Sequence, residues 1–238
     1  TTKNNLAVIY LEEGKHEQAE AFYSQLLEAE RRVLGAEHPT TIAIMNNLAA
    51  AYREEGKYAQ AEPLFSQTIK MSKRVLGTEH PLTLNFMAEF AYMYQKQGKY
   101  ALAESYAAQS LAGRRKTLGT DQPDTMMSIA DVALAELSQG KFTESEPLAR
   151  EASELNRKNQ PDDWERFRAD TLLGASLAGQ SKYTEAEPLL LEGYKGMVDR
   201  KDHMGAPDRY HLERAHEWLV EFQKKHGRPE KAAAIAKE

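Results

Sequence analysis

The chain repeats itself with a period of 42 residues, and this feature constrains its fold more than any other. Residues 4–20 read NNLAVIYLEEGKHEQAE, and residues 46–62 read NNLAAAYREEGKYAQAE. When residues 4–41 are laid on residues 46–83, 22 of 38 positions match. Self-similarity at a fixed period indicates a stack of units, each of which buries its apolar face against its neighbours.

Two turn signals mark the boundaries within and between the repeats. The first is a glycine or its replacement, followed by a lysine or arginine, at Gly14, Gly56, Gly98, Gly140, Ser181 and Gly227. The second is a proline that ends LGAEHP, LGTEHP, LGTDQP and a shortened NQP, at Pro39, Pro81, Pro123 and Pro161. Proline favours the first turn of a helix and glycine the position after its end. Each repeat is therefore predicted to contain two antiparallel helices, A and B.

Between these signals the apolar residues follow a helical period, as Met45, Leu48, Ala49 and Tyr52 do in the second copy. We expect A helices at about residues 3–13, 39–55, 81–97, 123–139, 161–180 and 207–226. We expect B helices at about residues 16–34, 58–76, 100–118, 142–158, 183–199 and 229–237. Three prolines fall inside B helices, where each removes one helical hydrogen bond: Pro63, Pro147 and Pro188.

The composition is that of an ordinary folded chain and excludes several kinds of site. The 238 residues carry a formal net charge of -5, with 41% hydrophobic and 28% charged residues. This mild negative charge gives no support for nucleic acid or an anionic membrane as a partner. The absence of cysteine excludes disulfides, thiolate metal sites and cysteine nucleophiles. No signal peptide or apolar run of roughly 20 residues is visible, so we expect a cytoplasmic location.

The second copy resembles the tetratricopeptide repeat. The positions that match its pattern are Leu48, Ala49, Tyr52, Gly56, Tyr58, Ala61 and Phe65. The 42-residue period, with NNLA, EGKY and LGTEHP, is similar to the kinesin light chain variety of this repeat. The resemblance implies an all-α fold, namely a right-handed α-solenoid of about six antiparallel helix pairs. It also implies that the A helices line the concave side.

The two ends of the chain differ from the central copies. Residues 1–199 are expected to form five repeats, of which the first lacks its opening turn. Because the sequence begins TTKNNLA without methionine, we expect the natural protein to continue upstream. Residues 200–238 are expected to form a loop and an atypical sixth helix pair carrying Trp218 and Phe222. Such a pair would close the last apolar face of the stack.

The resemblance implies which side chains line the concave groove. The candidate peptide-binding residues are Asn5, Asn46, Asn47, Arg53, Asn85, Glu89, Tyr92, Lys96 and Asp131. Asn5 and Asn47 occupy the position at which similar arrays hold a peptide backbone. The chemistry suits this role because a carboxamide both donates to and accepts from a peptide group.

The other candidates would supply specificity. Arg53 and Lys96 would add charge recognition, and Tyr92 would add a flat apolar contact. Glu89 and Asp131 replace asparagine at the backbone-binding position, which favours a mixed or partly basic ligand on the C-terminal part of the groove. An alternative interpretation is purely structural: the asparagines hydrogen-bond only to neighbouring helices or to water.

No catalytic, metal or cofactor site is expected. His38 and His80 each follow a glutamate, but neighbouring helix axes already lie about 8–10 Å apart, so equivalent residues of successive repeats cannot share one ion. We expect both histidines at helix starts instead. No nucleophile–base pair, phosphate loop or metal-ligand spacing is present in the sequence.

Three hypotheses about function remain open. The leading one is a non-catalytic scaffold that binds a peptide segment of a protein partner in the groove. The second is a structural or self-associating arm of a larger multidomain protein, with an upstream domain of the same chain as a further partner. The third is a regulator that changes its dimensions when a peptide effector binds. An enzyme is not expected.

Overall fold

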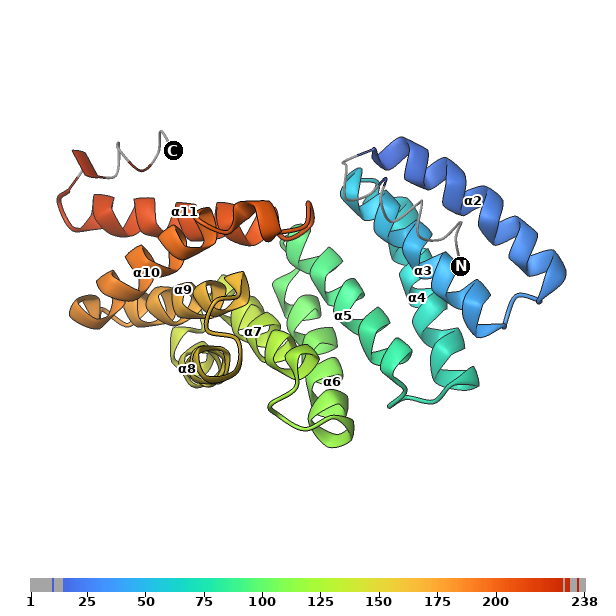
Figure 1. Ribbon diagram of the computed structural model, residues 1–238, viewed down its shortest axis with the longest axis horizontal. Coiled ribbons are helices and arrows are strands. Elements are labelled where there is room, and N and C mark those ends of the chain that lie inside the picture. The colour runs from blue at the N-terminus through green and yellow to red at the C-terminus, as the bar shows by residue number, and fades with distance from the viewer. Residues whose placement is uncertain (1–9, 11–14, 229, 232–234, 236–238) are drawn as a thin grey trace. The chain divides into compact units, whose positions relative to one another are not determined.

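The computed structural model describes residue 10, residues 15–228, residues 230–231 and residue 235. Within this part of the chain there are ten α-helices, one short 3-10 helix and no strand (Figure 1). The helix expected over residues 3–13 lies almost wholly outside the described residues, as does most of the one expected over residues 229–237. The chain divides after Gly119 into two compact units, so the single array expected over residues 1–199 stays a prediction.

Unit 1, residues 1–119, contains five of the described helices, and each packs against the next one in the chain (Figure 1). They are α2 (His16–Val33), α3 (Pro39–Glu54), α4 (Tyr58–Val75), α5 (Pro81–Lys96) and α6 (Tyr100–Thr117). The helices α3 and α5 are A helices, and the other three are B helices. Every start agrees with the sequence-based prediction, and every end falls one residue earlier.

Unit 2, residues 120–238, continues the alternation of A and B helices. Its elements are α7 (Pro123–Ser138), α8 (Phe142–Asn159), α9 (Trp164–Gly179), α10 (Tyr183–Val198), the 3-10 helix η1 (Lys201–His203) and α11 (Arg209–Lys225). Successive α-helices again pack side by side. The loop expected after residue 199 contains the 3-10 helix, and α11 takes the place of a sixth A helix.

Histidine and proline together start the A helices of unit 1. The His38 Nδ1 atom accepts a hydrogen bond of 3.2 Å from the Thr40 N–H, and His80 Nδ1 accepts one of 3.2 Å from the Leu82 N–H. Each histidine precedes a proline at the first helical position. A side-chain acceptor here satisfies an N–H group that has no partner within the helix. The predicted helix-start role of both histidines is confirmed.

The A helix after the shortened loop begins later than predicted. The sequence predicts a start at Pro161, but α9 begins at Trp164. The cause is Asp163, whose carboxylate accepts a hydrogen bond of 2.9 Å from the Glu165 N–H. Aspartate is a strong N-cap, so the helix begins after it and the proline remains in the loop.

The turn from each A helix to its B helix requires a left-handed residue. Glycine supplies this conformation at Gly56, Gly98 and Gly140, with φ of +72°, +72° and +76°. In the next repeat Ser181 adopts it, with φ of +65°. The turn keeps its hydrogen bond, since the Lys182 N–H donates to the Leu177 carbonyl at 3.0 Å. The serine therefore carries a backbone strain that glycine avoids.

At four of these turns the cation that follows binds a glutamate of the preceding B helix. The pairs are Lys57–Glu20 at 2.6 Å, Lys99–Glu62 at 3.2 Å, Lys182–Glu146 at 2.7 Å, and Arg228–Glu187. Partly exposed pairs of this kind contribute about 0–1 kcal/mol each. Each pair links a turn to the B helix of the preceding repeat. This recurring contact explains why the letters GK and AE recur in the sequence.

Aromatic packing in unit 1 changes between copies. The B-helix aromatic residues Tyr23 and Phe65 are fully buried, but the third copy has the smaller Ala107 at that position. Aromatic contacts are supplied from two other positions, because the Phe90 ring lies 5.6 Å from that of Phe65 and 4.7 Å from that of Tyr106. The core of the third repeat is thus built from a different set of rings.

Candidate functional site

Arg53 is the centre of a polar cluster between the two A helices of unit 1. Its side chain projects from α3 and is only 4% exposed. The guanidinium binds the Glu54 carboxylate at 2.7 Å, the Glu89 carboxylate on α5, and the Glu89 main-chain carbonyl at 3.3 Å. Burial disfavours the charge of Arg53, but Glu89 and Glu54 outweigh it and raise the pKa above the ordinary value. The arginine is fixed inside the protein.

Tyr92 and Lys96 of α5 complete this cluster. The Arg53 guanidinium lies 4.7 Å from the centre of the Tyr92 ring, and the Lys96 Nζ atom lies 5.5 Å from it. Lys96 also binds Glu54 at 2.9 Å. Burial raises the pKa of Glu54, but the charges of Arg53 and Lys96 more than offset this and lower it. Two cations face two carboxylates, so the cluster is neutral as a whole.

The structure thus brings four predicted site residues together, but not as the sequence suggested. Arg53 was expected to face a ligand, whereas it is buried and bound to Glu54 and Glu89. The reason is its position next to the end of α3, where the neighbouring A helix supplies the opposite charge. Of the four, Tyr92, Lys96 and Glu89 keep partly exposed side chains.

The asparagines of α3 differ in their environment. Asn46 is 6% exposed, so the expectation that it faces the groove is wrong, because its face of α3 packs inside unit 1. Asn47 is half-buried and lies next to Tyr23. Burial raises the pKa of Tyr23 to about 12, although a hydrogen bond with Asn47 opposes the shift. Asn5 lies outside the described residues.

Asn85 is an exposed residue near the start of α5. Its side-chain oxygen accepts a hydrogen bond of 2.5 Å from Arg114 at the end of α6. Arg114 is 3% exposed. The amide NH₂ of Asn85 keeps the donor capacity that a peptide carbonyl would use.

In unit 2, Asp131 pairs with a buried arginine. Arg168 on α9 is 3% exposed, and it binds Asp131 on α7 at 2.5 Å and Glu165 at 3.1 Å. Burial is the main cause that raises the pKa of Glu165 to about 7, with Asp131 and Asp208 adding to it against Arg168. This part of unit 2 thus holds more carboxylates than its central arginine neutralises.

The acidic residues at the asparagine position therefore need a new explanation. Glu89 and Asp131 were expected to indicate a partly basic ligand. Each is instead bound by an arginine from a neighbouring A helix, Arg53 or Arg168. Within each unit the acid and the arginine link successive A helices, so neither acid is by itself evidence for a basic ligand.

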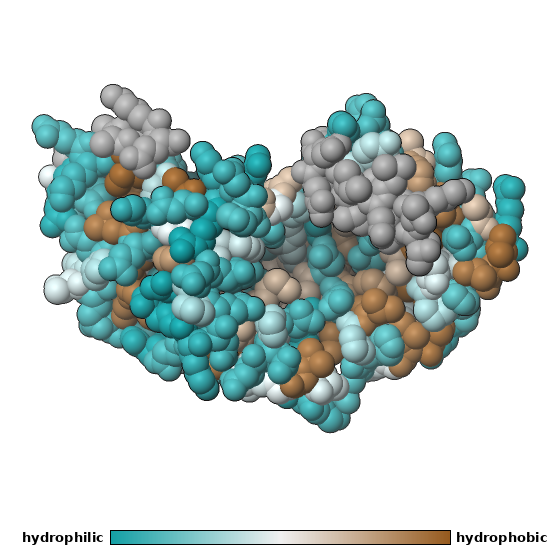
Figure 2. Space-filling view, in the orientation of Figure 1, coloured by the Kyte–Doolittle hydropathy of each residue, from teal (hydrophilic) through white to brown (hydrophobic). Residues whose placement is uncertain are grey.

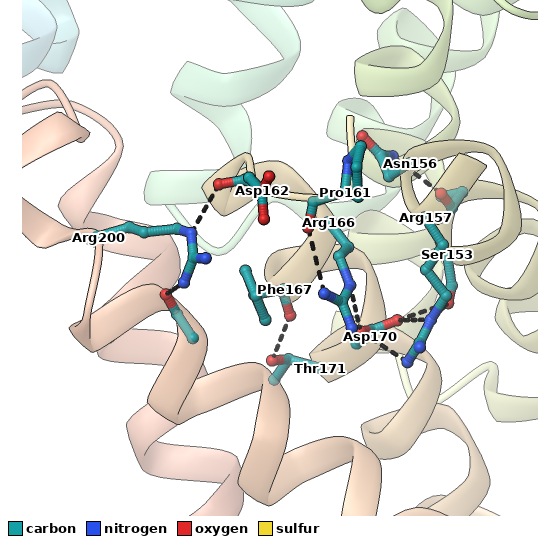
Figure 3. A network of polar contacts seen from close by, with 12 residues as sticks. Ser153, Asn156, Arg157, Pro161, Asp162, Arg166, Phe167, Asp170, Thr171 and Arg200 are labelled. Atoms are coloured by element: carbon teal, nitrogen blue, oxygen red, sulfur yellow. Dashed lines mark hydrogen bonds and ion pairs between the residues drawn. The ribbon is translucent and has the colours of Figure 1, made fainter. Parts of the chain in front are cut away.

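A second polar network joins α8, α9 and the loop between them (Figure 3). Asp170 is fully buried, and its carboxylate accepts hydrogen bonds from Ser153 at 2.6 Å and from Arg157 at 2.8 and 3.0 Å. Burial raises its pKa, while Ser153 and Arg157 oppose the rise. Its polar atoms face other side chains of the protein (Figure 3), which indicates a structural role.

Two arginines hold the shortened loop in place. Arg166, which also pairs with Asp170, donates to the Pro161 carbonyl at 3.2 Å, and Arg200 donates to the Asp162 carbonyl at 2.6 Å. The Phe167 ring lies between these arginines, 4.5 Å from one guanidinium and 4.3 Å from the other (Figure 3). The loop is therefore clamped from both sides without the LGxEHP residues of the earlier copies.

A hollow of about 540 Å³ opens in unit 2, near the turns that join its A and B helices. It lies between the ends of α7 and α9, the starts of α8 and α10, and α11. Four aromatic side chains line it: Phe142, Tyr183, Trp218 and Phe222. The rim includes the charged residues Arg214, Glu221 and Lys225 of α11. The hollow thus combines aromatic side chains with charged groups of both signs, which together can hold an amphipathic ligand.

A smaller hollow of about 10 Å³ lies beside the buried Arg168. Arg214 and Trp218 line both hollows, and Arg168 and His211 line the smaller one. The Arg214 guanidinium lies 5.1 Å from the centre of a Trp218 ring. Arg214 and Trp218 are therefore the two residues that the hollows share.

Sequence reasoning missed this region. It treated Trp218 and the aromatic residues at B-helix starts as packing residues. The reason is that α11 departs from the repeat pattern, so the register gave no equivalent position for Trp218. A useful signal was nevertheless present: Arg214, Trp218, Glu221 and Lys225 follow a helical period in the sequence.

The described residues contain no group of three or more histidines and carboxylates placed to hold a metal ion. None of the described helices combines the length and apolar character needed to cross a membrane.

Comparison with known proteins establishes the family. The tetratricopeptide repeat family model matches residues 1–74, 42–116 and 83–158, which together span more than half of the chain. The chain is a tetratricopeptide repeat protein. Curated protein sequences give no match to it. Repeats of this family form protein-interaction scaffolds, and the fold described above has the same paired-helix architecture.

Solved structures share this fold. One holds the nearly identical TPR-like repeats of a putative kinesin light chain from Podosopora anserina. It is 25% identical to this tetratricopeptide repeat chain, with a TM-score of 0.71, and the match covers 83% of this chain and 94% of that one. BtubC (BKLC) from P. vanneervenii is 16% identical over 92% of this chain and 87% of that one, with a TM-score of 0.67. Aspartyl phosphate phosphatase F from Bacillus subtilis is 13% identical over 98% and 71%, with a TM-score of 0.62.

Proposed function

We propose that the protein is a non-catalytic scaffold that binds a peptide segment of a partner protein, with the aromatic hollow of unit 2 as its main anchor. The observation that carries the proposal is this hollow of about 540 Å³ with Trp218 and Phe222 on its α11 wall. Aromatic side chains supply a large share of the binding energy at protein interfaces.

The chemistry of the rim supports a peptide as the ligand. Arg214, Glu221 and Lys225 offer charged groups of both signs around an apolar floor, and Ser138 and Ser181 offer hydroxyl groups. An apolar side chain of the partner would enter the hollow, and its main chain would bond to the rim. In unit 1, Asn47 and Asn85 are the remaining candidates for main-chain contacts, because both keep part of their surface exposed.

The test begins with a peptide array probed with the full chain, followed by measurement of the dissociation constant of the best peptides. The Trp218→Ala variant should weaken binding at least tenfold, as expected for an interface hot spot. The matched control is Trp164→Ala, which removes the other tryptophan, a residue that stacks on His211 outside the aromatic hollow. Asn47→Ala should weaken binding by a smaller factor.

The proposal fails if the selected peptides bind Trp218→Ala and the unchanged chain equally well. It also fails if Trp164→Ala weakens binding as much as Trp218→Ala while both variants keep the melting temperature of the unchanged chain.

A second candidate function is self-association, and an observation in unit 1 favours it. On the face shown in Figure 2 the surface is mostly hydrophilic, with smaller hydrophobic areas. Large hydrophobic residues are exposed at the C-terminal ends of all three described B helices of unit 1: Val33, Leu34, Val75 and Leu118. Light scattering over a concentration series tests this candidate. A monomer at every concentration would exclude it, and a dimer abolished by Val33→Lys would support it.

A further inference from the structure

A second kind of hollow lies between α4, α5 and α6 of unit 1, away from the aromatic hollow of unit 2. Its volume is about 390 Å³. Glu62 and Pro63 of α4 line it, together with the aromatic residues Phe90 and Tyr94 of α5 and Tyr106 of α6. The three rings are in mutual contact, with centres 4.5 to 5.9 Å apart. The hollow therefore joins a carboxylate to an aromatic wall.

The groups that line this hollow suit a positive charge. The carboxylate of Glu62 attracts a cation, and aromatic rings attract one through their electron-rich faces. Pro63 has no N–H group, so the Ala59 carbonyl, which also lines the hollow, has lost its usual donor four residues later in the helix. A partner that donates hydrogen bonds and carries positive charge suits the carboxylate, the aromatic rings and the Ala59 carbonyl.

The protein already places one of its own cations at this site. The Lys99 Nζ atom lies 3.2 Å from a Glu62 carboxylate oxygen and 5.4 Å from the centre of the Tyr94 ring. The Tyr94 hydroxyl donates to the other Glu62 oxygen at 3.2 Å. The Lys99 side chain is 45% exposed. An exposed ion pair of this kind is weak, so another cation can replace Lys99 at little cost.

The same arrangement recurs at the equivalent place in unit 2. Glu187 and Pro188 of α10 line a hollow of about 390 Å³ with the rings of Tyr183 and Phe222. Here Arg228 binds Glu187, as Lys99 binds Glu62. The glutamate, the helical proline and the cation recur with the repeat, whereas the rings come from different positions: from α5 and α6 in unit 1, and from the start of α10 and α11 in unit 2.

We propose that the hollow beside Pro63 binds a lysine or arginine side chain of a partner protein, with Lys99 as an internal competitor for the same carboxylate. This site is separate from the aromatic hollow of unit 2 and does not depend on it. The ligand replaces Lys99 at Glu62 and places its cationic group against the Tyr94 and Tyr106 rings.

Titration with small probes tests the proposal on the full chain. The probes are Nα-acetyl-lysine methylamide and Nα-acetyl-arginine methylamide, and the neutral control is Nα-acetyl-glutamine methylamide. NMR of isotope-labelled tyrosine rings reports on the hollow beside Pro63 through Tyr106, which lines neither hollow of unit 2 described above. The cationic probes should shift the Tyr106 signals in a saturable manner, and the neutral control should not.

Two variants separate binding from a structural role. Lys99→Gln removes the competitor and should tighten binding at Tyr106 by about twofold to fivefold, the range expected for an exposed ion pair. Glu62→Gln should abolish it. Lys57→Gln is the matched control, because it removes the equivalent lysine of the preceding turn, which does not line the hollow.

The expected pattern is a gain for Lys99→Gln, a loss for Glu62→Gln and no change for Lys57→Gln. Equal shifts with the glutamine compound, or no gain for Lys99→Gln, would overturn the proposal. If Glu62→Gln lowers the melting temperature, the decision rests on Lys99→Gln, because a merely structural lysine would give no gain.

Discussion

Ser153 of α8 and Asp170 of α9 share a hydrogen bond of 2.6 Å in the core of unit 2. Asp170 is fully buried and Ser153 is 3% exposed. In the second copy and the start of the third, the equivalent positions hold Ile69 and Met87, which are both buried. An apolar pair of the repeat has therefore been replaced by a polar pair, and Arg157 completes it by binding the same carboxylate.

Removing the carboxylate should be strongly destabilising. The Asp170→Ala variant leaves Ser153 without its acceptor and leaves Arg157 and Arg166 without their counter-charge. Breaking a buried ion pair from one side costs about 3–5 kcal/mol; because both arginines keep some exposure, we expect a cost of about 3 kcal/mol. The free energy of unfolding, measured by urea denaturation, checks this.

The double variant Ser153→Ile/Asp170→Met is the control for this prediction. It restores the apolar pair that the repeat uses at Ile69 and Met87. Replacing a buried polar pair by packed apolar residues is often neutral or stabilising, but Arg157 and Arg166 still lack their counter-charge, so the double variant should recover part of the stability that Asp170→Ala loses. If the double variant were as unstable as Asp170→Ala, an apolar pair could not replace the polar pair at this place in the core.

Arg53 should behave as a structural residue. Arg53→Ala leaves the carboxylates of Glu54 and Glu89 without their main partner, and we expect a loss of about 3 kcal/mol in the free energy of unfolding. Lys96→Ala is the comparison, because its side chain is 22% exposed and its pair with Glu54 is only part of the cluster. We expect less than about 1 kcal/mol for this change. If both variants lost the same stability, Arg53 would not be the main partner of the Glu54 and Glu89 carboxylates.

The helix boundaries were predictable because local chemistry sets them. Glycine with positive φ forms the turns at Gly56, Gly98 and Gly140, and proline starts α3 and α5. These effects act within a few residues, so they can be read from the sequence. The late start of α9 also has a local cause, because the Asp163 side chain caps the helix at its first turn.

The site was harder to predict because it depends on contacts between repeats. The register placed Arg53 on the A-helix side, but it could not show that Glu89 lies within reach and binds the guanidinium. Likewise, the register assigns no partner to Trp218, because α11 follows no earlier copy. Burial and pairing across helices are properties of the packed units, and a single repeat pattern does not contain them.

Glu165 should make the stability of unit 2 depend on pH. Its pKa is raised to about 7 in the folded protein, whereas an unfolded glutamate has a pKa of about 4.3. The folded state thus keeps a proton that the unfolded chain has lost. The resulting stabilisation is complete below about pH 4.3 and declines as the pH rises to about 7.

Chemical denaturation at pH 5 and pH 8 measures this effect. We expect the free energy of unfolding to fall by roughly 2 kcal/mol from this group. Glu165→Gln should reduce the fall, while Glu185→Gln, an exposed change on α10, should leave it unchanged. An unchanged pH dependence in Glu165→Gln would contradict the raised pKa.

The left-handed Ser181 offers a direct route to a more stable protein. Its φ of +65° is costly for a residue with a Cβ atom. The equivalent Gly140 has φ of +76°, and a Cβ atom at that position would meet no other atom within 4 Å, so the cost comes from the backbone alone. Ser181→Gly removes a strain of about 1 kcal/mol. The greater freedom of glycine in the unfolded chain offsets part of this gain, so the free energy of unfolding should rise by less than that amount.

The reverse change at the neighbouring turn is the matched test. Gly140→Ser introduces the same strain into a turn that lacks it and should lower the free energy of unfolding by about 1 kcal/mol. Thermal and urea denaturation of both variants measure the two effects. Opposite signs of similar size would show that the strain is a property of the left-handed turn. A loss of stability in Ser181→Gly would instead show that the hydrogen bond of 3.1 Å from Tyr183 to the Ser181 hydroxyl outweighs the strain.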